Sequence, residues 1–118
     1  MRFDRYTVIL LTLRPDAPVM TDDEAADLQD RHLAHGAGLQ DRGLVLARGP
    51  LVDQDDERFR GFSIWSVDQA TARQHAEADP AVLAGRLAVQ VMTWMMPAGN
   101  LGFSKVHPPR SLAEAADD

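Results

Sequence analysis

Four histidines are the side chains of this sequence best suited to proton transfer near neutral pH. His32 and His35 lie three residues apart in a segment predicted to be helical, whereas His75 and His107 stand alone. A histidine beside a carboxylate can take and return a proton, because the carboxylate orients the ring and stabilises its charged form. Proton abstraction next to a carbonyl group, followed by elimination or isomerisation, needs little more than such a pair in a pocket that excludes water.

Other kinds of chemistry have little support in the sequence. His32 and His35 can share a helix face, but two imidazoles make an incomplete metal site, and no HExxH motif or nearby carboxylate pair completes it. The chain has no cysteine, which excludes disulfides, thiolate metal sites and a cysteine nucleophile. Glycine-rich nucleotide loops and a Gly-x-Ser-x-Gly motif are also absent. We therefore predict no metal and no organic cofactor.

The length of 118 residues fits one domain, so any active site is built from this domain or from copies of it. Lysine and arginine total 12 against 18 aspartates and glutamates, and the resulting charge of −6 does not suit nucleic-acid binding. The longest apolar runs, residues 6–13 and 91–98, are too short to span a membrane. The N-terminal segment lacks a signal-peptide cleavage site, so we expect a soluble, cytoplasmic protein.

Four segments have the composition of β-strands, rich in β-branched and aromatic residues: residues 5–13, 44–52, 59–67 and 87–96. The first strand should end where Pro15 disfavours regular structure. Gly49 and Pro50 are expected to break the second strand. The first and fourth strands are apolar on both faces of the pleat, which indicates that both faces of the sheet are covered.

A long helix is predicted between the first two strands. Thr21 and Glu24 have the spacing of a capping box, so the helix should follow them and end near Arg42, before Gly43. His32 lies in the middle of the stripe of this helix that faces the protein. The stripe consists of Ala25, Leu28, His32, Gly36 and Leu39.

A second helix is predicted between the last two strands. Asp68 has the character of its N-cap, and the helix should run to about Ala78. Asp79 directly precedes Pro80, which is typical of the start of a further short helical turn, because aspartate accepts backbone N–H bonds and proline suits the first position. This turn should end near Gly85.

The order strand, helix, strand, strand, helix, strand predicts an α+β, ferredoxin-like βαββαβ domain with a four-stranded antiparallel sheet. We place this domain at residues 1–96 and a C-terminal tail at residues 97–118, which is either mobile or lies across a partner subunit. Two helices cover only one face of such a sheet, so we expect a homodimer in which a second copy covers the other face. Candidate contact residues are Ile9, Leu11, Trp65, Met92 and Trp94.

An ordered set of short segments resembles the YCII-related domain family over about residues 6–94. The segments are HLAH at 32–35, Gly43, LARGP at 46–50, RG at 60–61, AEADP at 76–80, GRLAVQV at 85–91 and Trp94. The resemblance implies two ferredoxin-like subunits that form a dimeric α+β barrel. It also implies an active site that pairs a histidine of the first helix with the aspartate of the Asp-Pro motif, here His32 and Asp79. Where members of the family have an assigned activity, it is a lyase-like elimination on a small ring compound.

Three residues depart from the pattern of this family. Arg48 interrupts the usual Ala-Gly-Pro sequence, and Gly36 replaces a common helix leucine. Met92 stands where many members carry a histidine near the tryptophan, so any role of that histidine is lost here. The resemblance therefore does not carry a particular reaction over to this chain.

We predict a small enzyme of lyase or isomerase type that acts on a small organic molecule, with His32 as general acid and base oriented by Asp79. Arg48 is a candidate to hold an anionic substrate group, and Trp65 and Trp94 are candidates for apolar walls. The alternative is a non-catalytic small-molecule-binding or accessory domain. In that case the histidine is a hydrogen-bonded core residue, the aspartate is an N-cap, Arg48 is a surface or ion-pairing residue, and the tryptophans belong to the core or an interface.

Overall fold

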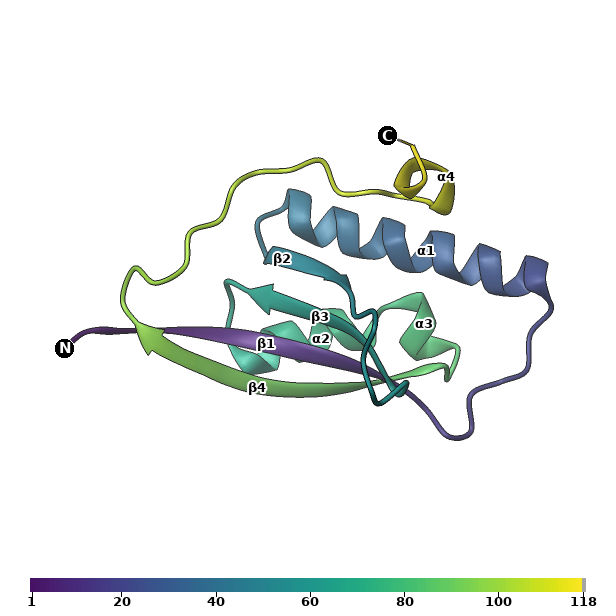
Figure 1. The fold of residues 1–118 in the computed structure, drawn as a ribbon, viewed down its shortest axis with the longest axis horizontal. Helices are drawn as coiled ribbons and strands as arrows, with labels where there is room; N and C mark the ends of the chain where they lie inside the picture. The colour runs from purple at the N-terminus through teal and green to yellow at the C-terminus, as the bar shows by residue number, and fades with distance from the viewer. Residues whose placement is uncertain (118) are drawn as a thin grey trace.

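The computed structural model describes residues 1–117 and contains a four-stranded antiparallel sheet in the order β2-β3-β1-β4 (Figure 1). Its strands are β1 Phe3–Leu13, β2 Val45–Pro50, β3 Phe59–Trp65 and β4 Leu87–Pro97. The two long strands β1 and β4 pair along their whole length. This order and connectivity confirm the predicted α+β, ferredoxin-like fold.

Strand β2 differs from the prediction, because Gly49 and Pro50 lie within the strand instead of breaking it. The strand is at the edge of the sheet and pairs on one side only. A proline, which has no N–H group, is therefore tolerated there without the loss of a hydrogen bond between strands. Its pairing with β3 remains in register through Gly49↔Phe62 and Pro50↔Gly61.

The helices are α1 Asp22–Asp41, α2 Gln69–Glu77, α3 Pro80–Leu83 and α4 Leu112–Ala115. Both hydrogen bonds of the predicted capping box are present at the start of α1. The Thr21 N–H donates to Glu24 Oε1 over 3.0 Å, and the Glu24 N–H donates to Thr21 Oγ1 over 3.1 Å. Gly43 follows the helix with φ of 76°, a left-handed conformation that glycine adopts without strain.

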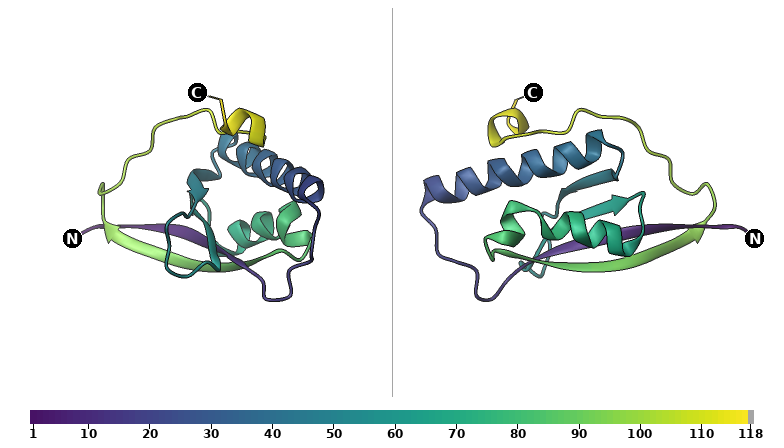
Figure 2. Two further views of the ribbon diagram at one scale, coloured as in Figure 1. Left: turned by 45° about the vertical axis from the view of Figure 1, so that its right-hand side comes forward. Right: turned by 180° about the vertical axis from the view of Figure 1, so that it is seen from behind.

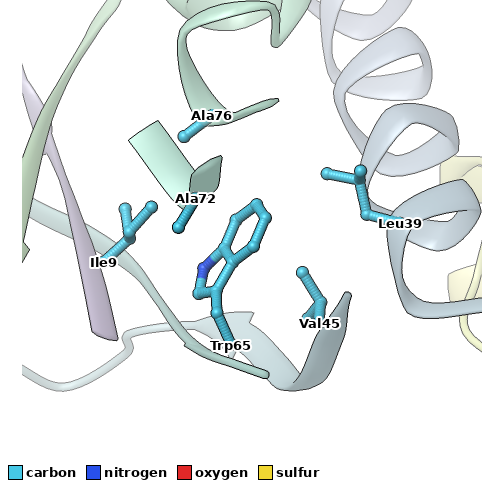
Figure 3. Close-up of a cluster of buried hydrophobic side chains, with 6 residues drawn as sticks. All are labelled: Ile9, Leu39, Val45, Trp65, Ala72 and Ala76. Carbon is cyan, nitrogen blue, oxygen red and sulfur yellow. The ribbon is translucent and has the colours of Figure 1, made fainter. Parts of the chain in front are cut away.

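The main core lies between the sheet and helices α1 and α2 (Figure 3). Trp65 of β3 is only 3% exposed and lies among side chains of β1, β2, α1 and α2. The buried members of this cluster are Ile9, Leu39, Val45, Trp65, Ala72 and Ala76. Ile9, Leu11 and Trp65 therefore face the helices, so their placement among the candidate dimer contacts was wrong.

In the part of the chain that the structure describes, no helix lies over the opposite face of the sheet, and most of the residues on this face are apolar (Figure 1). The strand register places Tyr6 beside Trp94, and Val8 beside both Met92 and Ile64. Met92 and Trp94 are 39% and 45% exposed, respectively. We call the residues Tyr6, Val8, Leu10, Phe62, Ile64, Met92 and Trp94 the open face.

The C-terminal tail runs from the end of β4 back to α1 of the same chain, where α4 packs (Figures 1 and 2). The Leu112 N–H donates to Asp30 Oδ1 over 2.7 Å, and Arg110 forms an ion pair with Asp41. Phe103 packs edge-on against the ring of Tyr6.

None of the helices within residues 1–117 is long and apolar enough to cross a membrane.

The capping box at the start of α1 gives a first prediction. Thr21→Ala should lower the free energy of unfolding by about 1 kcal/mol, since the Glu24 N–H then loses its acceptor. Urea denaturation followed by circular dichroism measures this difference. Val19→Ala is the matched control, because Val19 is fully exposed two residues upstream. Equal stability of the two variants would contradict the role assigned to the cap.

Candidate active site

His32 and Asp79, which lie 47 residues apart in the sequence, form a direct hydrogen bond in the structure. The Nδ1 atom of His32 on α1 lies 2.7 Å from Oδ2 of Asp79, directly before α3. Their side chains are only 13% and 8% exposed, respectively. Because α1 packs beside α3, this pair joins two helices that belong to different halves of the sequence.

The second carboxylate oxygen of Asp79 has a separate task. Oδ1 accepts the backbone N–H of Ala81 over 2.9 Å and so caps α3, with Pro80 at the first helical position. Asp79 thus uses one oxygen for the helix and the other for His32. The cap fixes the carboxylate, and the fixed carboxylate in turn orients the imidazole.

His35 is also anchored, but to the backbone. Its Nε2 atom lies 2.9 Å from the carbonyl oxygen of His75 at the end of α2, so this ring ties α1 to α2. His35 therefore does not point toward a metal shared with His32. In the described part of the chain, no group of three or more His, Asp or Glu side chains is arranged to hold a metal ion.

The pair lies in the wall of a cavity of about 670 Å³ between α1, the β2 and β3 side of the sheet, and the tail. His32, Asp79, Arg48 and Trp65 all line this cavity. Trp94 is not among the lining residues and belongs to the open face instead. The structure thus brings four of the five candidate site residues together and places the fifth elsewhere.

Arg48 reaches the cavity because of an irregularity in β2. Val45 pairs with Trp65 and Ala47 with Ile64, so two residues of β2 advance for one residue of β3. This bulge turns Arg48, which pairs with Ser63, to the same side of the sheet as Val45. Burial lowers the pKa of the Arg48 guanidinium, and the nearby charge of Asp79 acts in the opposite direction.

The sequence analysis missed several residues of the cavity. Arg60 and Arg86 were not among the predicted site residues, and both line the cavity. The tail also contributes to the wall, on its own chain, although the sequence analysis expected it to be either mobile or across a partner subunit. Its lining residues are Val106, His107, Pro108, Pro109, Leu112 and Ala115. No sequence signal places a tail on a particular helix, because that contact depends on single side chains such as Asp30.

The model of the YCII-related domain matches residues 6–95, which is most of the chain. The chain belongs to the YCII-related domain family. No curated protein matches the sequence of this YCII-related protein. One similar solved structure is that of 5-chloro-2-hydroxyhydroquinone dehydrochlorinase from Burkholderia phenoliruptrix AC1100, in complex with 2,5-dihydroxybenzoquinone. The identity is 23% and the TM-score 0.49, over 75% of this chain and 92% of the other. Nothing about the reaction of this YCII-related protein follows from a likeness at that level.

The two tasks of Asp79 can be separated by substitution. Asp79→Ala should cost about 3 kcal/mol of stability, because both the Ala81 N–H and the partly buried His32 ring lose their partner. Asp79→Asn should cost only about 1 kcal/mol, since the amide oxygen still caps α3. Urea denaturation of both variants measures the difference. Equal losses would show that the cap on α3 contributes little to stability.

Proposed function

We propose that this YCII-related protein is a small enzyme of lyase or isomerase type that acts on a small organic molecule by acid/base chemistry. The observation that carries the proposal is the hydrogen bond between His32 and Asp79 in the wall of a cavity. A histidine held by a buried carboxylate, next to a space that can take a small molecule, is the arrangement that proton transfer requires.

The hydrogen bond determines which ring nitrogen is available for chemistry. A carboxylate accepts hydrogen bonds, so Nδ1 of His32 carries the proton that it donates to Asp79 Oδ2. Nε2 then holds a lone pair and can accept a proton from a substrate. Asp79 remains charged and stabilises the imidazolium that forms, without taking the proton itself.

The proposed reaction has two steps. Nε2 of His32 removes a proton from a carbon next to a carbonyl group, and the electron pair of the broken C–H bond moves into the carbonyl to form an enolate. In an elimination, the enolate then expels a leaving group from the neighbouring carbon, and the imidazolium returns its proton to that group. In an isomerisation, the imidazolium returns the proton to a different carbon of the same molecule.

The walls of the cavity favour such a reaction. Ile9, Leu39 and Trp65 supply apolar surface near the pair, and Ser63 accepts the indole N–H of Trp65 over 2.7 Å. The tryptophan therefore stays fixed without competing for the substrate. An apolar wall reduces access of water and strengthens the electrostatic effect of the single carboxylate.

Hydrogen exchange tests the proton transfer without knowledge of the natural substrate. We expect the protein to accelerate the exchange of C–H hydrogens of a small ketone or 2-oxo acid in D₂O, measured by NMR over a panel of such compounds. His32→Gln should slow this exchange at least about a hundredfold, because the base is lost. His75→Gln is the matched control, since His75 does not line the cavity.

Two outcomes would contradict the proposed enzyme. One is wild-type protein that accelerates exchange of no compound in the panel. The other is His32→Gln protein that retains the wild-type rate while circular dichroism shows the native fold. A lower melting temperature of His32→Gln protein with an unchanged rate of hydrogen exchange would favour the non-catalytic binding domain instead.

We also propose that the protein forms a homodimer through the open face of the sheet. This face carries Met92 and Trp94 at substantial exposure, beside the apolar residues Tyr6 and Val8 of β1. Two twisted sheets pack face to face at a spacing that side chains of this size fill. A second copy with the same apolar surface is complementary to it by symmetry.

Light scattering coupled to size-exclusion chromatography tests the dimer. The wild-type protein should have twice the chain mass of 13.0 kDa. Trp94→Glu should shift it to the monomer, because a charge on the open face would be buried in the interface. Met95→Glu is the matched control, since Met95 is the next residue of β4 and points to the other side of the sheet. A monomeric wild-type protein, or a dimeric Trp94→Glu protein, would contradict this interface.

A further inference from the structure

The cavity has a charge opposite to that of the whole protein. Among the described residues, three arginines line it, Arg48, Arg60 and Arg86, against the single carboxylate of Asp79. The chain as a whole carries a net charge of −6. Positive charge is therefore concentrated at the place where a substrate would bind, and such a cavity attracts anions.

Arg48 differs from an ordinary surface arginine in its surroundings. Among the residues that the structure describes, its guanidinium has no hydrogen-bonded or ion-paired partner, and only the more distant charge of Asp79 acts on it favourably. By contrast, Arg60 already donates a hydrogen bond to the carbonyl oxygen of Glu57 over 2.6 Å. Arg48 is partly buried, and no described side-chain nitrogen is both fully buried and without a partner, so its free donors are open to the cavity, where an anion can reach them.

The position of Arg48 depends on a glycine of α1. A Cβ atom at Gly36 would lie closer than 3.0 Å to Cζ, Nη2 and Nε of Arg48. Gly36 is thus the place where the guanidinium passes directly beneath the helix. At Gly38, on the same helix, no atom lies within 4 Å of the position that a Cβ would take, so a side chain there would meet no neighbouring group.

The guanidinium and the base both lie against helix α1. Gly36 follows His32 by four residues, so the two positions lie on one side of α1, about 6 Å apart along its axis. A molecule bound by Arg48 at one end would present atoms a few bonds away to the imidazole. Arg48 and His32 are therefore spaced for opposite ends of one small molecule.

We propose that Arg48, in the space left by Gly36, forms an anion-binding subsite for the carboxylate of a small organic acid. This inference rests on the proposed function, because it names the substrate class of that site. The planar guanidinium offers paired N–H donors that match the two oxygens of a carboxylate. The substrate is then an organic acid whose reacting carbon lies a few bonds from its carboxylate.

Ligand binding tests this subsite without any turnover. Isothermal titration calorimetry with benzoate and with benzamide compares two probes of the same shape, of which only benzoate is an anion. Wild-type protein should bind benzoate more tightly than benzamide. Arg48→Gln should reduce benzoate affinity by about tenfold or more and leave benzamide affinity unchanged.

A second variant tests the role of the glycine. Gly36→Ala should reduce benzoate affinity to a similar extent although Arg48 is still present, because the new methyl group displaces the guanidinium. It should have little further effect in an Arg48→Gln background. The variant should fold, since the three nearest atoms to the new group all belong to the flexible end of Arg48.

Two matched controls complete the design. Gly38→Ala adds the same methyl group to the same helix in open space, and Arg31→Gln removes an exposed arginine of α1 that pairs with Asp27. Both should keep the wild-type preference for benzoate. Absence of this preference in wild-type protein, or its survival in Arg48→Gln, would overturn the subsite. These measurements do not involve His32. The anion subsite can therefore be refuted while the hydrogen-exchange test supports the enzyme, and the enzyme can be refuted while benzoate binding supports the subsite.

Discussion

The contact between His32 and Asp79 connects two parts of the chain that the sheet alone does not join. Helix α1 lies over the edge of the sheet and beside α3, and the hydrogen bond between these side chains fixes that position. The same aspartate starts α3, so the geometry of the cap and the geometry of the pair depend on each other. His35 supplies a second polar contact, from α1 to α2, and the cavity lies between α1 and the sheet.

Much of the fold could be predicted because its signals are local. The capping box at Thr21 and the Asp79-Pro80 pair each fix a helix start through hydrogen bonds within a few residues, and both are present in the structure. The strand order follows from the succession of elements, which leaves few ways to build an antiparallel sheet. His32 was placed on the inner side of its helix by periodicity, and its partner was implied only by the family resemblance.

The features that could not be predicted depend on contacts between distant residues. Period-two alternation says which residues share a face but not which face is covered, so Ile9 and Trp94 could not be distinguished before the helices were placed. The side on which Arg48 lies is set by a bulge, which shifts the alternation by one residue. The arrangement of Gly36 over Arg48 likewise requires knowledge of how α1 crosses β2.

The walls of the cavity come from two separate stretches of the chain. The sheet, the histidine and its aspartate are all contained in the first 97 residues, whereas part of the cavity wall is supplied by residues 106–115. The His-Asp contact is therefore built without any residue of the tail, while the size and the entrance of the binding space depend on it. Substitutions in this segment can change which molecules enter the cavity and leave the pair itself untouched.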